Sequence, residues 1–74
     1  MLENLKDYLK HQERWFEAYI ESGNTDISPT EAYWLAIGRA VGATELATDC
    51  GISFEIAEAF YEDTRKKLDE LISR

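Results

Sequence analysis

Few side chains in this 74-residue sequence have the types and spacing that catalysis needs. His11 is the single histidine, and on a helix it lies between Tyr8 and Trp15 on a charged flank, where we expect a solvated side chain and not a general base. Cys50 is the single cysteine, and the neighbouring acid Asp49 disfavours the thiolate that a nucleophile requires. We therefore predict no catalytic residue, and we expect Cys50 to be a small buried core residue.

The carboxylates form two ridges at helical spacing, but neither ridge has the pattern of a metal site. The sequence contains no Glu-x-x-His pair, no Cys-x-x-Cys pair, no Asp-rich calcium loop and no glycine-rich phosphate loop. We interpret both ridges as solvated faces and predict no metal, no cofactor and no enzymatic activity. The ridges are Glu13, Glu17, Glu21 and Glu55, Glu58, Glu62.

The elements that position these residues are predicted to be helical throughout. Apolar residues from Leu2 to Tyr19 recur at steps of three and four, which indicates a first amphipathic helix ended by Gly23 and Asn24. The run Ser28-Pro29-Thr30-Glu31 combines a capping hydroxyl, a first-turn proline and a capping-box glutamate, with Ile27 as the preceding staple, and so predicts the start of a second helix.

We expect this second helix to stop at Gly42, and we expect Gly38, with Ala36 and Ala40, to let another helix pack closely. A short third helix is predicted from Thr44 to Gly51, and a fourth begins after the cap Ser53. The predicted fold is an all-α bundle of three main helices and one short helix, in a single domain spanning residues 1–74. The core of its second half is expected to include Leu46, Ile56 and Phe60.

Composition limits the classes of partner and compartment. The net charge is −7, and no basic residue occurs between Ala40 and Thr64, which disfavours nucleic acid and anionic membranes as partners. A lone cysteine and an N-terminus without an apolar run favour a cytoplasmic protein without a signal peptide. No stretch approaches the roughly 20 apolar residues that a membrane span needs.

Residues 44–61 resemble the bihelical unit of the helix-turn-helix superfamily. The pattern consists of an alanine, a glycine four residues later, an apolar residue and a small polar cap, here Ala47, Gly51, Ile52 and Ser53. The resemblance implies a close-packed helix pair whose second helix presents its exposed start to the major groove of DNA. The residues at that start are Ser53, Phe54, Glu55 and Glu58, and the two carboxylates would repel phosphates.

The nine aromatic residues point to binding, because a core of this size cannot bury them all. In the adjacent pairs Trp15-Phe16 and Tyr33-Trp34, both members cannot face one core, so we expect one member of each pair at an interface. Homodimerisation would enlarge a small core. The residues predicted to bind a partner are Trp15, Tyr19, Trp34, Phe54, Glu55, Glu58 and Glu62.

Three functions remain open from the sequence. The first is a small acidic regulator that binds another protein with a basic or nucleic-acid-binding surface, as an adaptor or inhibitor; its size and charge are similar in kind to those of phage-encoded inhibitors. The second is a dimeric helix-turn-helix transcription regulator. The third is a structural assembly subunit whose exposed aromatics contact only copies of itself. We expect the first.

Overall fold

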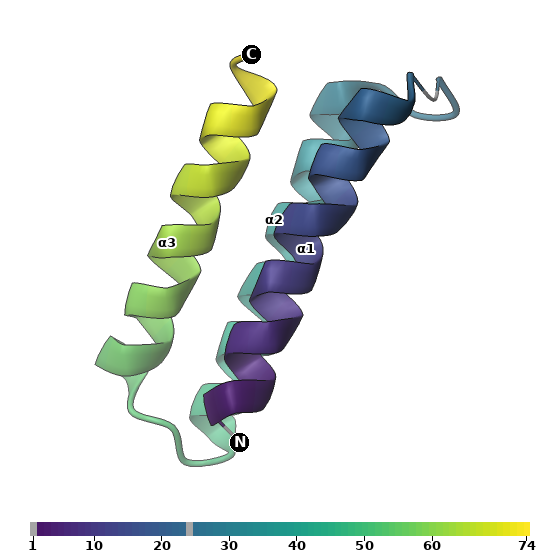
Figure 1. The fold of residues 1–74 in the computed structure, drawn as a ribbon. Helices are drawn as coiled ribbons and strands as arrows, with labels where there is room; N and C mark the ends of the chain where they lie inside the picture. Colours follow the sequence, from purple (N-terminus) through teal and green to yellow (C-terminus); the bar gives the residue numbers. More distant parts are fainter. Residues whose placement is uncertain (1, 24) are drawn as a thin grey trace.

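Three helices of similar length lie side by side along the whole molecule (Figure 1). The computed structural model describes residues 2–23 and 25–74. Helix α1 spans Leu2–Ser22, α2 spans Pro29–Asp49 and α3 spans Phe54–Ile72. Successive helices run in opposite directions, so the α1–α2 loop and the end of α3 share one end of the bundle (Figure 1). The prediction of an all-α bundle is confirmed.

Local hydrogen bonds and backbone conformation explain where the helices begin and end. Ser28 Oγ accepts from the backbone N–H of Glu31 at 3.1 Å, and the Glu31 carboxylate accepts from the backbone N–H of Ser28, which is the predicted capping box. Gly23 ends α1 with φ of 69°, and Gly51 forms the α2–α3 turn with φ of 106°. Both values lie in the left-handed region that glycine adopts without strain. Asn24, the other predicted stop residue, lies outside the described residues.

The predicted stop at Gly42 and the separate short helix from Thr44 to Gly51 are wrong. α2 continues through Gly42 to Asp49, and Gly42 is not among the described glycines with positive φ. The hydroxyl of Thr44 donates to the carbonyl of Ala40 at 2.8 Å and so serves the same helix instead of opening a new one. The described part of the chain therefore has three helices. Within residues 44–61, the end of α2 and the start of α3 are joined by the turn at Gly51, and α3 returns alongside α2 (Figure 1).

Alanines form much of the buried side of α2. Ala32, Ala36 and Ala40 are fully buried, and their small side chains allow α1 and α3 to approach the backbone of α2. The core has two clusters. The cluster nearer the α1–α2 loop contains Phe16, Ala32, Ala36, Ile37, Leu68 and Leu71. The cluster nearer the α2–α3 turn contains Leu5, Leu9, Ala40, Ala47 and Ala57.

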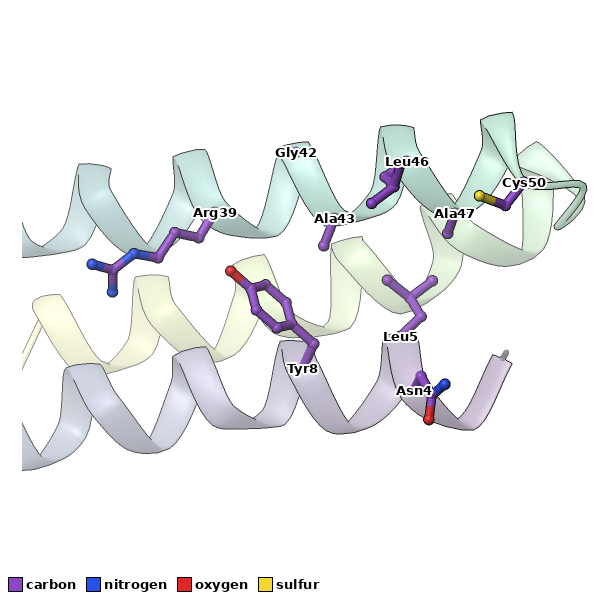
Figure 2. Close-up of a pocket in the computed structure, with 9 residues that line it drawn as sticks. All are labelled: Asn4, Leu5, Tyr8, Arg39, Gly42, Ala43, Leu46, Ala47 and Cys50. Carbon is purple, nitrogen blue, oxygen red and sulfur yellow. The ribbon is translucent and has the colours of Figure 1, made fainter.

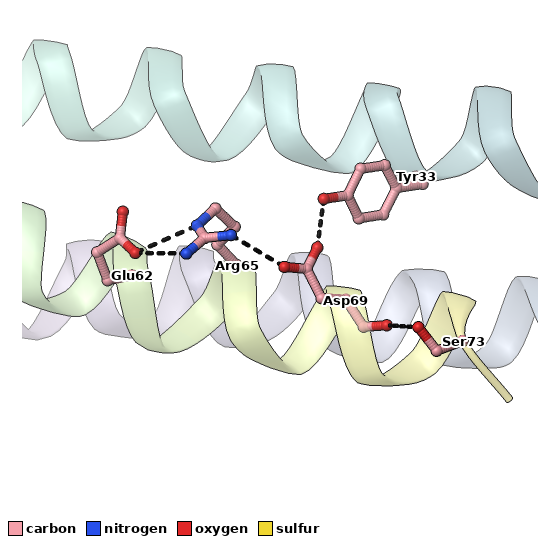
Figure 3. A network of polar contacts seen from close by, with 5 residues as sticks. All are labelled: Tyr33, Glu62, Arg65, Asp69 and Ser73. Atoms are coloured by element: carbon pink, nitrogen blue, oxygen red, sulfur yellow. Dashed lines mark hydrogen bonds and ion pairs between the residues drawn. The ribbon is translucent and has the colours of Figure 1, made fainter.

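Polar contacts join α3 to each of the other two helices. Between α1 and α3, the buried hydroxyl of Thr64 donates to the buried carboxylate of Glu13 at 2.7 Å. Between α2 and α3, the hydroxyl of Tyr33 donates to the carboxylate of Asp69 (Figure 3). Arg65 bonds Asp69 at 2.9 Å and continues this network along α3 (Figure 3).

Candidate functional site

Helix α2 has small residues inside and large apolar residues outside. Its buried side is rich in alanine, whereas Trp34, Leu35 and Leu46 expose 62%, 45% and 65% of their surface. A helix that is apolar on all sides is normally buried on all sides. Here α1 and α3 cover only the alanine side, and the opposite side is solvent-accessible. We call this opposite side the open face of α2, formed by Glu31, Trp34, Leu35, Gly38, Gly42, Glu45, Leu46 and Asp49, all of them exposed.

A groove of about 540 Å³ lies between the second half of α2 and the first half of α1 (Figure 2). Tyr8 and Leu5 extend from α1 toward α2, whereas Leu46 on α2 and Cys50 directly after α2 lie near the end of the groove (Figure 2). The lining is mainly apolar, so the groove suits a nonpolar side chain better than a polar metabolite. The full lining is Asn4, Leu5, Tyr8, Arg39, Gly42, Ala43, Leu46, Ala47 and Cys50.

Two glycines at the centre of the open face have open space where a side chain would lie. A Cβ atom added at Gly38 or at Gly42 would meet no atom within 4 Å, and neither residue is among those with positive φ. In a helix interior each glycine costs about 1 kcal/mol of stability relative to alanine. The expectation that Gly38 helps to pack the bundle together with Ala36 and Ala40 is therefore wrong, because Gly38 lies on the open face and the two alanines lie inside.

Charges on the open face are mostly acidic and lie toward its two ends. Glu31 is in the first turn of α2, and Glu45 and Asp49 are in its last turns. The base beside this face is Arg39, whose guanidinium lies 4.9 Å from the centre of the Trp15 ring on α1. This stacking holds the cation at the side of the groove. The open face is therefore an apolar centre with acidic ends.

The aromatic residues that were predicted to bind a partner have different environments. Trp15 is half-buried and stacks on Tyr19 with ring centres 5.7 Å apart. The Tyr19 hydroxyl donates to the carbonyl of Ile27 and accepts from the Ile27 N–H, so Tyr19 anchors the α1–α2 loop. Trp34 is the most exposed of these three, and it packs edge-on against the half-buried Tyr33.

The predicted partner-binding residues of α3 lie at the other end of the bundle from Trp34. Phe54 begins α3 and is 58% exposed, and Glu55 and Glu58 follow it on the surface. A hydrogen bond from the Ser53 hydroxyl lowers the pKa of the Glu55 carboxyl below its ordinary value. Glu62 is half-buried and bonds Arg65. The structure thus does not bring the seven predicted residues together in one site.

Sequence reasoning misplaced several residues near the α2–α3 end of the bundle. Leu46 was expected in the core but is exposed, as is Ile56 at 45%. Phe60 is half-buried against the second core cluster. Cys50 is exposed and lines the groove, so its predicted burial is also wrong. The signal that identifies the true inner side is the run of alanines at helical spacing, Ala32, Ala36, Ala40 and Ala47.

A metal-binding cluster and a helix that could span a membrane are both absent from the described residues. His11 is exposed, and residues 2–23 and 25–74 contain no group of three or more His, Cys, Asp or Glu that could hold a metal ion. Within the same residues, none of the helices has the length and apolar character needed to cross a bilayer.

Comparison with known protein families, curated proteins and solved structures finds no match to this chain.

Proposed function

We propose that this chain is a small, acidic, non-enzymatic regulator that binds another protein through the open face of α2 and the adjoining groove. One observation carries the proposal: Trp34, Leu35 and Leu46 are exposed while alanines occupy the inside of the same helix. Exposing these large side chains to water is unfavourable, at about 25 cal/mol for each Å² of apolar surface. Exposed aromatic and aliphatic side chains beside a groove are typical of protein-binding surfaces.

A helix-turn-helix transcription regulator is the second candidate. Gly51 has the positive φ expected in the turn of such a unit, and Ala47 and Ala57 belong to one buried cluster. The exposed start of α3 carries Glu55 and Glu58, however, and like charges keep this surface away from phosphates. These acids favour the protein-binding function over the DNA-binding function.

Site-specific photo-crosslinking tests the proposed function. A benzophenone amino acid in place of Leu46 should form an adduct with a specific polypeptide in an extract of the source cells, identified by mass spectrometry. The adduct should disappear when excess wild-type protein is added. The matched control carries the same photo-label at Ala59, an exposed position on α3, and should not form this adduct.

A DNA-binding measurement separates the two candidates. Fluorescence anisotropy with a labelled random duplex at low salt gives phosphate attraction its best chance. We expect no binding under these conditions. Binding that weakens steeply with salt would favour the transcription regulator and contradict the protein-binding proposal.

A further inference from the structure

We infer that the occupant of the open face of α2 is an amphipathic α-helix of another protein, with basic residues at both ends of its apolar stripe. This inference rests on the proposed function and specifies the partner of the same surface.

The shape of the open face suits a helix. Leu35 and Leu46 stand on either side of a shallow centre at Gly38 and Gly42, where the backbone carries no side chain. A ridge of side chains on an approaching helix can enter this centre and pack against the two leucines, as in the helix-in-groove mode of recognition. Because nothing in the bundle itself contacts the two glycine positions, the space above them is open to a partner.

The charges of the open face specify the ends of the partner. Glu31 lies at one end of the apolar centre, and Glu45 and Asp49 lie at the other. Glu31 and Glu45 are 14 positions apart on α2, which corresponds to about 21 Å at the helical rise. A helix of about 20 residues with Lys or Arg at both ends of its apolar stripe would meet these acids with opposite charges.

A second copy of this chain is a poorer occupant. If two α2 helices pack antiparallel about Gly38 and Gly42, the Glu31 of one copy lies opposite the Asp49 of the other. If they pack parallel, each acid lies opposite its own counterpart. Either arrangement places like charges together, on chains that each carry a net charge of −7.

The test uses synthetic, fluorescein-labelled helical peptides of about 20 residues, a length that matches α2. The first peptide has a leucine and alanine stripe with lysines at both ends. The second has the same stripe with glutamates in place of the lysines. Anisotropy titrations at moderate salt should show at least tenfold tighter binding of the lysine peptide. Equal binding of the two peptides, or no binding of the lysine peptide, would overturn the inference.

A pair of variants locates the peptide on the open face. Gly42→Leu fills the centre of the face and should weaken binding of the lysine peptide at least tenfold. Because a side chain at position 42 meets open space, the variant should keep its helical circular dichroism and a melting temperature at or above that of the wild type. Ala59→Leu places the same leucine side chain at an exposed position of α3 and should leave binding unchanged. Unchanged binding by a folded Gly42→Leu protein would overturn the inference, since the peptide would then be held by net charge alone.

The cross-linking experiment distinguishes failure of this inference from failure of the proposed function. Mass spectrometry of the Leu46 adduct identifies the partner segment. A helical segment with basic ends supports the inference. An extended, irregular or acidic segment overturns the inference but leaves the protein-binding function standing, whereas the absence of any competed adduct contradicts both.

Discussion

At the scale of single residues, the hydrogen bond between Thr64 and Glu13 joins two buried polar side chains on different helices. Thr64→Val keeps the shape of the side chain but removes the donor, so the buried Glu13 carboxylate loses this hydrogen bond and keeps its ion pair with Lys10 at 3.7 Å. We expect the free energy of unfolding to fall by about 2 kcal/mol, as is typical for hydrogen bonds to charged groups. Urea denaturation monitored by circular dichroism measures this change.

Thr44→Val is the matched control for Thr64→Val. The Thr44 hydroxyl is half-buried and donates only to the carbonyl of Ala40 within its own helix. Its replacement should change stability by less than about 0.5 kcal/mol, because such a bond adds little to a helix. Equal losses from the two substitutions would mean that the Thr64–Glu13 hydrogen bond contributes no more to the free energy of unfolding than a hydrogen bond within one helix.

The Tyr33 hydroxyl gives the fold a dependence on alkaline pH. Burial, together with the hydrogen bond to Asp69, raises the pKa of Tyr33 to about 12 from the ordinary value of 10.0. A raised pKa means that the neutral phenol is favoured in the folded state, so this stabilisation is complete below pH 10 and is lost as the pH rises toward 12.

Tyr33→Phe tests this pH dependence. The variant should be less stable than the wild type by about 1 kcal/mol at neutral pH, and the difference should shrink as the pH rises from 10 toward 12. Urea denaturation midpoints of both proteins across this range give the comparison. A constant difference at all pH values would show that the loss comes from packing and not from the hydroxyl.

At the scale of the elements, short-range chemistry made some boundaries predictable. The capping box at Ser28 and Glu31 identified the start of α2 because both of its hydrogen bonds join residues three positions apart. Gly42 was misread as a stop because a glycine ends a helix only when it adopts a left-handed conformation, and the sequence does not reveal which glycine will do so.

The orientation of α2 was harder to predict for a different reason. Apolar residues occur all around this helix, so periodicity alone cannot select its inner side. Leucine and tryptophan are the expected core residues by size, yet the inner side of α2 consists mostly of alanines, together with Ile37, because α1 and α3 both pack closely against it. The candidate site was therefore hidden by the assumption that large apolar residues lie inside.

Glycine substitutions in α2 should stabilise the bundle, whereas the same substitution in the α2–α3 turn should destabilise it. Gly38→Ala and Gly42→Ala meet open space and should each raise the free energy of unfolding by about 1 kcal/mol. Gly51→Ala requires an alanine to adopt a backbone φ of 106°. This substitution should lower the free energy of unfolding by at least about 1 kcal/mol. Thermal and urea denaturation measure all three. A loss of stability at Gly38 or Gly42 would mean that the bundle itself uses these positions.

At the scale of the whole molecule, net charge governs association between copies. We expect homodimers of this chain to be weak, because the −7 charge of each copy opposes their association. Salt screens this repulsion, so the mean mass in sedimentation experiments should rise from low to high salt. Binding to a basic partner helix should show the opposite dependence, because salt weakens attraction between unlike charges.

A surface substitution serves as the control for this association. Leu46→Glu adds a further acid to the apolar centre of the open face, and this variant should remain monomeric at both salt concentrations. If it associates like the wild type, copies of the chain meet through another surface, such as the exposed Phe54 at the start of α3.

The position of Cys50 has a practical consequence for the study of this surface. It is the one thiol in the sequence, it is exposed, and it lies at the end of the groove near Leu46 (Figure 2). A maleimide dye will therefore attach to the unmutated chain at a single place beside the proposed interface. The emission wavelength and fluorescence anisotropy of that dye would report the association and dissociation of a bound molecule in real time.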